Sequence, residues 1–164
     1  MINSCKKDDF KNMPLREYIT SNWFFMEALF IEDLNDSMEI VDGEYAMYKN
    51  IDFFNFILTS EISYRKITFS DLPNNECGIK CYSDRKSSEN VILIKDDEKS
   101  IIWKADDGNG SPIRMEISRV GKDVRFKAFH PQYTNDYLLK LDDENKLNEM
   151  KSERNNIKCS CSTW

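Results

Sequence analysis

The chain has 164 residues, of which 40% are hydrophobic and 12% aromatic, so it can bury a core in one domain and is not intrinsically disordered. Its net charge of −6 disfavours binding to nucleic acid, because an acidic surface repels the phosphate backbone. No stretch approaches the roughly 18 consecutive apolar residues of a membrane-spanning helix, and no apolar signal segment opens the chain. We therefore expect one cytoplasmic domain over 1–164 without nucleic-acid or membrane partners. Loosely ordered arms are expected at 1–12 and 152–164.

Helical spacing begins just after Pro14. Apolar side chains such as Leu15 and Ile19 recur at steps of three and four, which is typical of one face of a helix. Proline is favoured in the first turn, so the sequence predicts a helix over 14–21. Residues 23–32 are compatible with a continued helix and also with a buried strand, because their run of aromatic and apolar side chains suits a strand covered on both faces.

The next two segments carry a turn signal and a cap signal. The pair Asp42-Gly43 lies within short mixed apolar runs over 38–48 and predicts a hairpin. The segment 51–61 is compatible with a helix capped by Asp52. It is equally compatible with a strand whose inward side chains are Phe54, Phe56 and Leu58.

The region 90–129 has the clearest pattern in the chain. Its four short apolar runs are separated by three turn-like breaks, as in an antiparallel meander. The last two runs alternate strictly between apolar and polar residues, which predicts one buried and one exposed face. Two further strands are predicted at 64–69 and 78–82, followed by a solvated loop at 83–89.

These elements together predict an α+β fold. An antiparallel meander sheet, with strands in 64–69, 78–82 and 90–129, is accompanied by helices near the N-terminus and the C-terminus. The C-terminal helix, within 142–154, is expected to be polar with Leu147 and Met150 as its only anchors. The meander is expected to supply much of the core through Val91, Leu93, Ile101, Trp103, Ile113, Met115, Ile117, Val124 and Phe126.

Metal and cofactor motifs are weak or missing. Five cysteines include two close pairs, Cys77/Cys81 and Cys159/Cys161, which could together bind zinc. Their spacings differ from the Cys-x2-Cys of structural zinc sites, so we expect free thiols, with metal binding as the alternative. The five glycines form no phosphate-binding loop, and no cofactor is expected.

The single histidine, His130, is the only candidate for histidine-based acid–base chemistry. No serine or cysteine lies in a recognisable nucleophile motif, and His130 precedes a proline at a break in the pattern. We therefore expect no catalytic residues and no enzyme. The alternative is a hydrolytic enzyme whose site combines His130 with carboxylates.

In size, acidity and lack of catalytic motifs, the chain resembles the immunity proteins of bacterial polymorphic and contact-dependent toxin systems. The resemblance implies a small acidic protein that covers the active site of a cognate toxin, often a nuclease; it transfers no residue roles. Acidic side chains would steer a basic toxin. A viral or host-modulating accessory protein is a further alternative. The expected partner-binding residues form three acidic clusters: Asp96, Asp97, Glu98, Asp106, Asp107, Asp142, Asp143 and Glu144.

Overall fold

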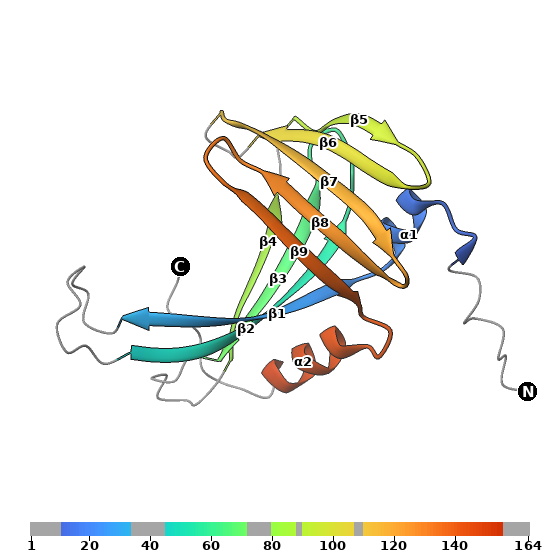
Figure 1. Ribbon diagram of the computed structural model, residues 1–164. Coiled ribbons are helices and arrows are strands. Elements are labelled where there is room, and N and C mark those ends of the chain that lie inside the picture. Colours follow the sequence, from blue (N-terminus) through green and yellow to red (C-terminus); the bar gives the residue numbers. More distant parts are fainter. Residues whose placement is uncertain (1–10, 34–44, 72–79, 88–89, 107–109, 156–164) are drawn as a thin grey trace, which may run out of the picture.

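The computed structural model describes residues 11–33, 45–71, 80–87, 90–106 and 110–155. Within these residues, two short helices flank nine strands (Figure 1). The elements in chain order are α1 (Leu15–Ser21), β1 (Phe24–Asp33), β2 (Tyr45–Phe56), β3 (Tyr64–Asp71), β4 (Lys80–Ser87), β5 (Ile92–Asp96), β6 (Ser100–Asp106), β7 (Pro112–Val120), β8 (Asp123–Phe129), β9 (Thr134–Leu141) and α2 (Lys146–Asn155).

All nine strands belong to one antiparallel sheet with the order β4-β3-β2-β1-β9-β8-β7-β6-β5. Within each half of the sheet, neighbouring strands are also consecutive in the chain, as in a meander. The first strand joins the last one through Phe24 opposite Leu141 and Phe25 opposite Lys140. This junction lets the sheet curl, so that β1–β4 pass behind and across β5–β9 in Figure 1. The predicted α+β fold with an antiparallel meander is therefore confirmed.

The two halves of the sheet pack together through an aromatic cluster. Phe56 of β2 lies edge-on to Phe126 of β8 and to Trp103 of β6, with ring centroids 5.3 and 6.1 Å apart. Trp103 and Phe126 are stacked, and all three side chains are almost completely buried. Helix α1 adds Leu15, Tyr18 and Ile19 to the same core. Contacts between residues far apart in sequence therefore hold the halves together.

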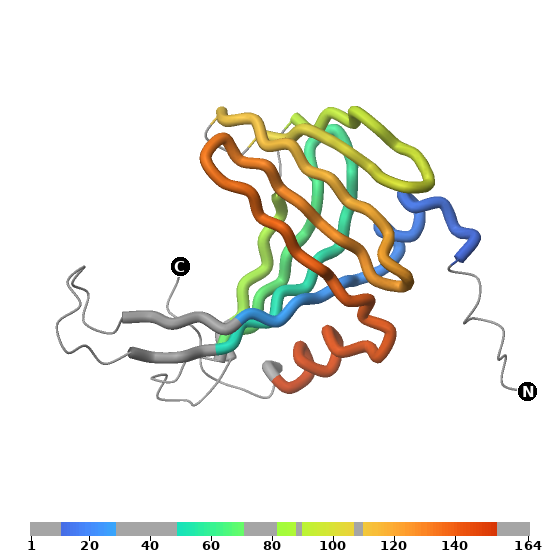
Figure 2. Tube along the Cα trace, in the orientation of Figure 1, coloured from blue at the N-terminus to red at the C-terminus, as the bar shows by residue number. Residues whose placement is uncertain are grey.

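The other face of β2 and β3 is covered by helix α2. Leu147 and Met150 of the helix are buried in a second cluster with residues of these two strands: Ile51, Phe53, Ile67 and Phe69. The Lys146 ammonium also lies 2.9 Å from Oε1 of Glu27 on β1. The tube in Figure 2 shows the helix beside the lower part of this half-sheet. The two predicted anchors of the C-terminal helix are confirmed.

The structure resolves both open alternatives as strands. Residues 23–32 contain most of β1, and the N-terminal part of 51–61 is the end of β2. Phe54, Phe56 and Leu58 are buried together, as the strand interpretation predicted. Phe53, which precedes Phe54, faces the α2 cluster, so this strand is buried on both faces. The helix predicted over 14–21 is confirmed as α1.

Two predictions need correction, and one strand was not predicted. The segment 83–89 is not simply a solvated loop, because β4 continues to Ser87 and pairs with β3. Residues 134–141 form an additional strand, β9, whose pattern is interrupted by an exposed Leu138. Leu93 is 38% exposed because β5 is the terminal strand of the sheet, whereas Val91 is half-buried and the other seven expected core residues are buried.

Some sequence predictions fall outside the described residues. The hairpin strands pair from Asp33 opposite Tyr45 onward, but the segment 34–44, with its Asp-Gly pair, is not described. Most of the expected arms, 1–10 and 156–164, is likewise not described, and residues 152–155 belong to α2. Among the described elements, neither helix is long and apolar enough to cross a membrane.

Candidate functional site

A cavity of about 610 Å³ lies between the two halves of the sheet. Its wall combines apolar and polar residues from β1–β4 on one side and β6–β9 on the other. The apolar part consists of Met26, Phe54, Ile113, Met115, Phe126 and Ala128. The polar part consists of Asp52, Tyr64, Lys66, Lys86, Ser87, Asp106, His130, Tyr133, Asn135 and Tyr137.

Asp52 is the buried carboxylate of this wall, with 8% of the residue exposed. Alternation along β2 places it on the same face as Phe54 and Phe56. Its Oδ1 accepts a 2.6 Å hydrogen bond from the Thr68 hydroxyl, which stands directly opposite on β3. Its Oδ2 lies 3.8 Å from the Lys66 ammonium. The carboxylate is thus held from one side by a hydroxyl and balanced by one cation.

The negative charge of Asp52 contributes to the raised pKa of two tyrosines. Burial raises the pKa of Tyr64 above its usual value; a hydrogen bond with Ser87 opposes this shift, and the Asp52 carboxylate adds to it. Burial also raises the pKa of Tyr137, and Asp52 is the largest electrostatic contributor. Both hydroxyls therefore stay protonated at neutral pH and can donate hydrogen bonds. The charge of Asp52 therefore acts on side chains of both β3 and β9.

His130 lies at the wall of the same cavity as Asp52 and Asp106. Its ring stacks on Tyr133 with centroids 4.3 Å apart, and its backbone amide donates to the Tyr133 carbonyl. Within the described part of the chain, no hydrogen bond or ion pair joins the His130 ring to a carboxylate. The cavity therefore brings the predicted histidine and two carboxylates to one wall without linking them as an acid–base pair.

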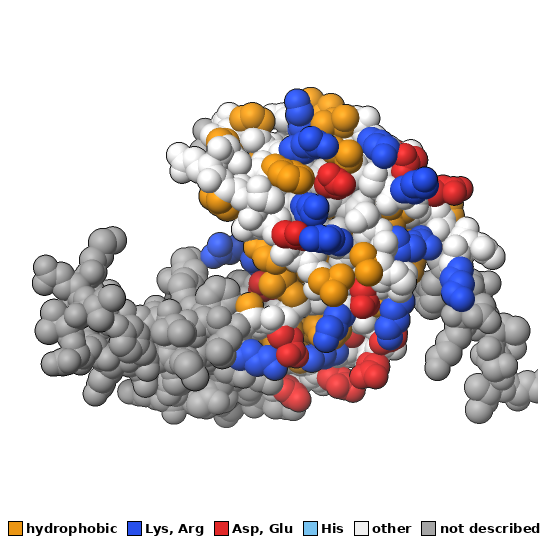
Figure 3. Space-filling model, viewed as in Figure 1, with side chains coloured by type: hydrophobic (Ala, Val, Ile, Leu, Met, Phe, Trp, Pro, Cys, Tyr) orange, Lys and Arg blue, Asp and Glu red, His pale blue; other side chains and the backbone are white. Residues whose placement is uncertain are grey.

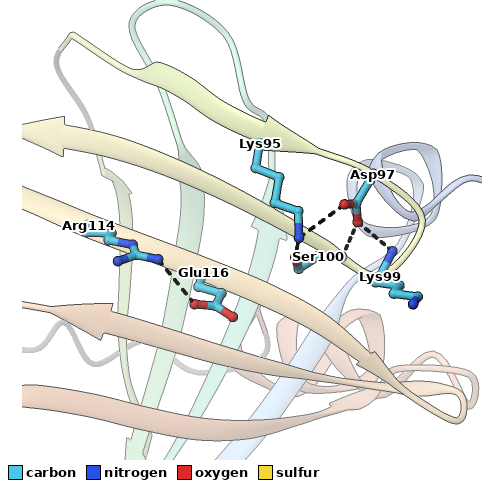
Figure 4. Close-up of polar contacts among 6 residues, drawn as sticks. All are labelled: Lys95, Asp97, Lys99, Ser100, Arg114 and Glu116. Carbon is cyan, nitrogen blue, oxygen red and sulfur yellow. Dashed lines mark hydrogen bonds and ion pairs between the residues drawn. The ribbon is translucent and has the colours of Figure 1, made fainter.

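The first acidic cluster forms the β5–β6 turn. Asp97 accepts backbone hydrogen bonds from Lys99 and Ser100 and lies 3.1 Å from the Lys95 ammonium (Figure 4). The amides of Ser100 and Lys99, followed by Lys95, lower the pKa of Asp97 to about 2. Asp96 pairs with Arg16 of α1 at 3.3 Å. Glu98, by contrast, is exposed at the tip of this turn.

The acidic cluster at residues 142–144, the second of the two that lie near α1, follows β9. Both carboxylate oxygens of Asp142 accept the first amides of α2, from Lys146 at 2.8 Å and Leu147 at 3.1 Å. Asp143 lies 2.7 Å from the Lys122 ammonium of the β7–β8 turn. Glu144 is exposed beside them. Cap and turn contacts therefore account for two of these three acids.

Helix α1 lies between the two clusters. It reaches the first through Arg16 and Asp96, and its Tyr18 hydroxyl donates to the Lys122 carbonyl next to the second. Six of the eight predicted acids are therefore near one end of the molecule, interleaved with basic side chains. Asp106 is separate from them, since it lines the cavity and accepts from the Gly110 amide. Asp107 lies outside the described residues.

The outer face of β7–β9 has no uniform charge. Arg125 forms a bidentate ion pair with Asp136 of β9, and Arg114 lies 3.9 Å from Glu116. Figure 3 shows basic, acidic and apolar side chains interspersed over this face, and Figure 4 shows the second of these pairs. Pairing of opposite charges, across strands for Arg125 and within β7 for Arg114, is the simplest explanation for the basic residues on this face.

Metal ligands cannot be assembled from the described residues, which contain no group of three or more histidine, cysteine or acidic side chains suited to an ion. Three of the four paired cysteines, Cys77, Cys159 and Cys161, lie outside those residues, and the side chain of Cys81 is not described either.

Sequence reasoning missed the central residue of the cavity. Asp52 was considered as a helix cap, whereas the structure places it inside a curled sheet. One signal was available: the strand interpretation of 51–61 puts Asp52 in line with Phe54 and Phe56, as a carboxylate on a buried face. Such a group needs a partner, which points to an inward polar site.

Comparisons with protein-family models, with curated proteins and with solved structures found no match to this chain.

Proposed function

We propose that this protein binds a small organic molecule in the cavity between the two halves of its sheet. The observation that carries the proposal is the cavity itself, with a volume of about 610 Å³. This lies within the range of about 300–1,000 Å³ that is usual for small-molecule sites. An apolar wall with a few fixed polar groups is also the usual composition of such sites, because apolar contact supplies affinity and polar groups supply orientation.

The arrangement favours binding over catalysis. A general base needs a partner that orients it and sets its proton affinity. The His130 ring is instead stacked on Tyr133, and Asp52 is engaged by Thr68 and Lys66. A hydrolytic site built on His130 and these carboxylates would require both to rearrange. We therefore propose that the ligand is held without being converted.

Fluorescence of the neutral dye Nile red tests this function. Its emission should rise saturably when purified protein is added, because the dye enters the apolar part of the cavity. The variant Ala128→Leu places a larger side chain on the cavity wall and should weaken dye binding about ten-fold, which corresponds to about 1.4 kcal/mol. Circular dichroism and thermal melting establish that the variant is folded.

The matched control is Lys127→Leu, which adds the same side chain to the opposite face of β8. It should leave the affinity for Nile red within about two-fold of wild type, equivalent to less than about 0.5 kcal/mol. Dye binding that does not saturate, or that Ala128→Leu leaves unchanged in a folded protein, would show that the cavity is not a binding site.

A second candidate function is neutralisation of a basic protein partner, as the resemblance to toxin immunity proteins implies. The position of both acidic turns beside α1 favours it, because one partner could contact both. Electrostatic attraction would then speed association. Glu98 and Glu144 are the best residues for testing this second function. Asp97 holds the β5–β6 turn and Asp142 caps α2, so Glu98 and Glu144 can be changed without removing those contacts.

The test is a pull-down from the source organism with a salt titration. A basic partner should be retained at low salt, released at high salt, and bound more weakly by the double variant Glu98→Lys/Glu144→Lys. The control Glu61→Lys changes an exposed acid in the 57–63 connection. Equal loss of binding in both variants, or retention that salt does not affect, would argue against an interface at the acidic turns.

A further inference from the structure

A cation already occupies part of the cavity. The Lys66 ammonium lies 3.8 Å from Oδ2 of Asp52 and 5.9 Å from the ring centroid of Phe54. An ammonium beside a carboxylate and over an aromatic ring is in a favourable electrostatic environment, because both the negative charge and the π face attract it.

The two members of this ion pair are held very differently. The Asp52 side chain is 12% exposed and is further fixed by the Thr68 hydroxyl. The Lys66 side chain is 40% exposed and lies on a flexible stem, so it can turn into solvent. A partly exposed pair of this kind contributes little to stability, because solvent screens the attraction. Lys66 is therefore replaceable, whereas Asp52 is a permanent part of the wall.

Further aromatic rings adjoin Phe54 in the cavity wall. Phe54 and Tyr64 have ring centroids 5.7 Å apart, Tyr64 and Phe126 are also 5.7 Å apart, and Phe126 and Tyr137 are 6.4 Å apart. All four rings line the cavity, as does Asp52. The wall therefore combines a buried carboxylate with several aromatic rings, which are the groups that recognise organic ammonium ions.

We infer that the cavity selects an organic ammonium ligand whose charged group takes the place of the Lys66 ammonium at Asp52. This inference rests on the proposed function, because it names the ligand class of the same cavity. The physical reason is that a buried carboxylate cannot be left without a counter-charge. A neutral ligand has to leave Lys66 in position. An anion could approach the exposed Lys86 of the same wall, but it would be repelled by the buried carboxylate of Asp52. A cation can replace Lys66 and keep the site neutral.

Three probes of similar size test the selectivity: benzylammonium, benzyl alcohol and benzoate. Each is titrated against the Nile red complex, and its binding is measured independently by calorimetry. Benzylammonium should displace the dye at a concentration about ten-fold lower than either of the others, as expected for carboxylate and cation–π recognition together. Equal displacement by all three probes, or a preference for benzoate, would overturn the inference.

Two variants show whether Asp52 is the selective group. Asp52→Asn keeps the size of the side chain and an oxygen that can accept from Thr68, but it removes the charge, so the preference for benzylammonium should disappear. Lys66→Met removes the competing ammonium and should strengthen benzylammonium binding several-fold. A folded Asp52→Asn protein that keeps the preference would contradict the inference. The inference would also be contradicted if the Lys66→Met protein bound benzylammonium no better than wild type. This second test holds whether or not the Asp52→Asn protein folds.

The outcomes separate this inference from the function on which it rests. If Nile red does not bind saturably, the cavity is not a binding site and both fail. If the dye binds and Ala128→Leu weakens it, but benzylammonium is not preferred, the cavity binds small molecules and only the ligand class is wrong.

Discussion

The Thr68 hydroxyl donates a 2.6 Å hydrogen bond to Oδ1 of Asp52 from the directly opposite position on β3. Strand register creates this contact, since directly opposed residues share a face of the sheet. The same register directs both side chains toward the other half of the curled sheet. A carboxylate that would be an ordinary surface group on an open sheet is therefore confined to a cavity wall.

Removing the hydroxyl of Thr68 should destabilise the fold. The variant Thr68→Val keeps the β-branched shape but leaves the buried carboxylate without this donor, so it should lower the free energy of unfolding by about 1–3 kcal/mol. Thr68→Ser keeps a hydroxyl donor and should lower the free energy of unfolding by less than Thr68→Val does. Urea denaturation followed by circular dichroism measures both. If the two variants proved equally stable, the hydrogen bond would not be contributing.

Acid should weaken the attachment of α2 through Glu27. Hydrogen bonds from Lys146 and Lys49 lower the pKa of Glu27 to about 2, compared with about 4.3 in an unfolded chain. A lowered folded-state pKa means that the contribution to stability is present above about pH 4.3 and is lost as the pH falls toward about 2. Glu27 is 40% exposed, so solvent screening limits its contribution to under about 1 kcal/mol.

The variant Glu27→Gln tests this acid dependence. The difference in stability between wild type and variant should be largest near neutral pH and should shrink below about pH 4. Urea denaturation at a series of pH values between 7 and 2, within the range where the protein folds, measures the difference. A constant difference across the series would mean that Glu27 stabilises the fold by something other than its charge.

Capping of α2 by Asp142 should be measurable on its own. Its carboxylate accepts the amides of Lys146 and Leu147, so Asp142→Ala should lower stability by about 0.5–2 kcal/mol. Asp142→Asn retains an acceptor and should recover much of the loss. The neighbouring Glu144→Ala is the surface control, with an expected change within about 0.5 kcal/mol. A cap role would be excluded if Asp142→Ala behaved like the control.

Position in the sheet should decide the cost of truncating similar side chains. Leu93 is 38% exposed on the terminal strand β5, and Leu93→Ala should cost less than about 1 kcal/mol. Ile117 is completely buried on β7, and Ile117→Ala should cost about 2–5 kcal/mol because it leaves a cavity. Thermal and urea denaturation of the two variants give the comparison. Similar losses would place Leu93 in the core after all.

Much of the meander was predictable because period-2 alternation directly encodes which face of a strand is buried. Ile113, Met115 and Ile117 are buried as that pattern predicts. The pattern fails for strands covered on both sides. In β2, Phe53 faces helix α2 while Phe54 faces the other half of the sheet, so the phenylalanine-rich run 53–56 carries no period that separates a strand from a helix.

The amino-acid sequence by itself determined the local structure: the helix before β1, the antiparallel meander and the two anchors of α2. These features depend on residues close together in the chain. Only the tertiary structure decided that β9 pairs with β1 and that the sheet curls. Only that curl turns Asp52, Tyr64 and Tyr137, from three separate strands, into one wall of a cavity. The physical reason is that alternation determines which face a side chain occupies, whereas long-range packing determines what that face meets.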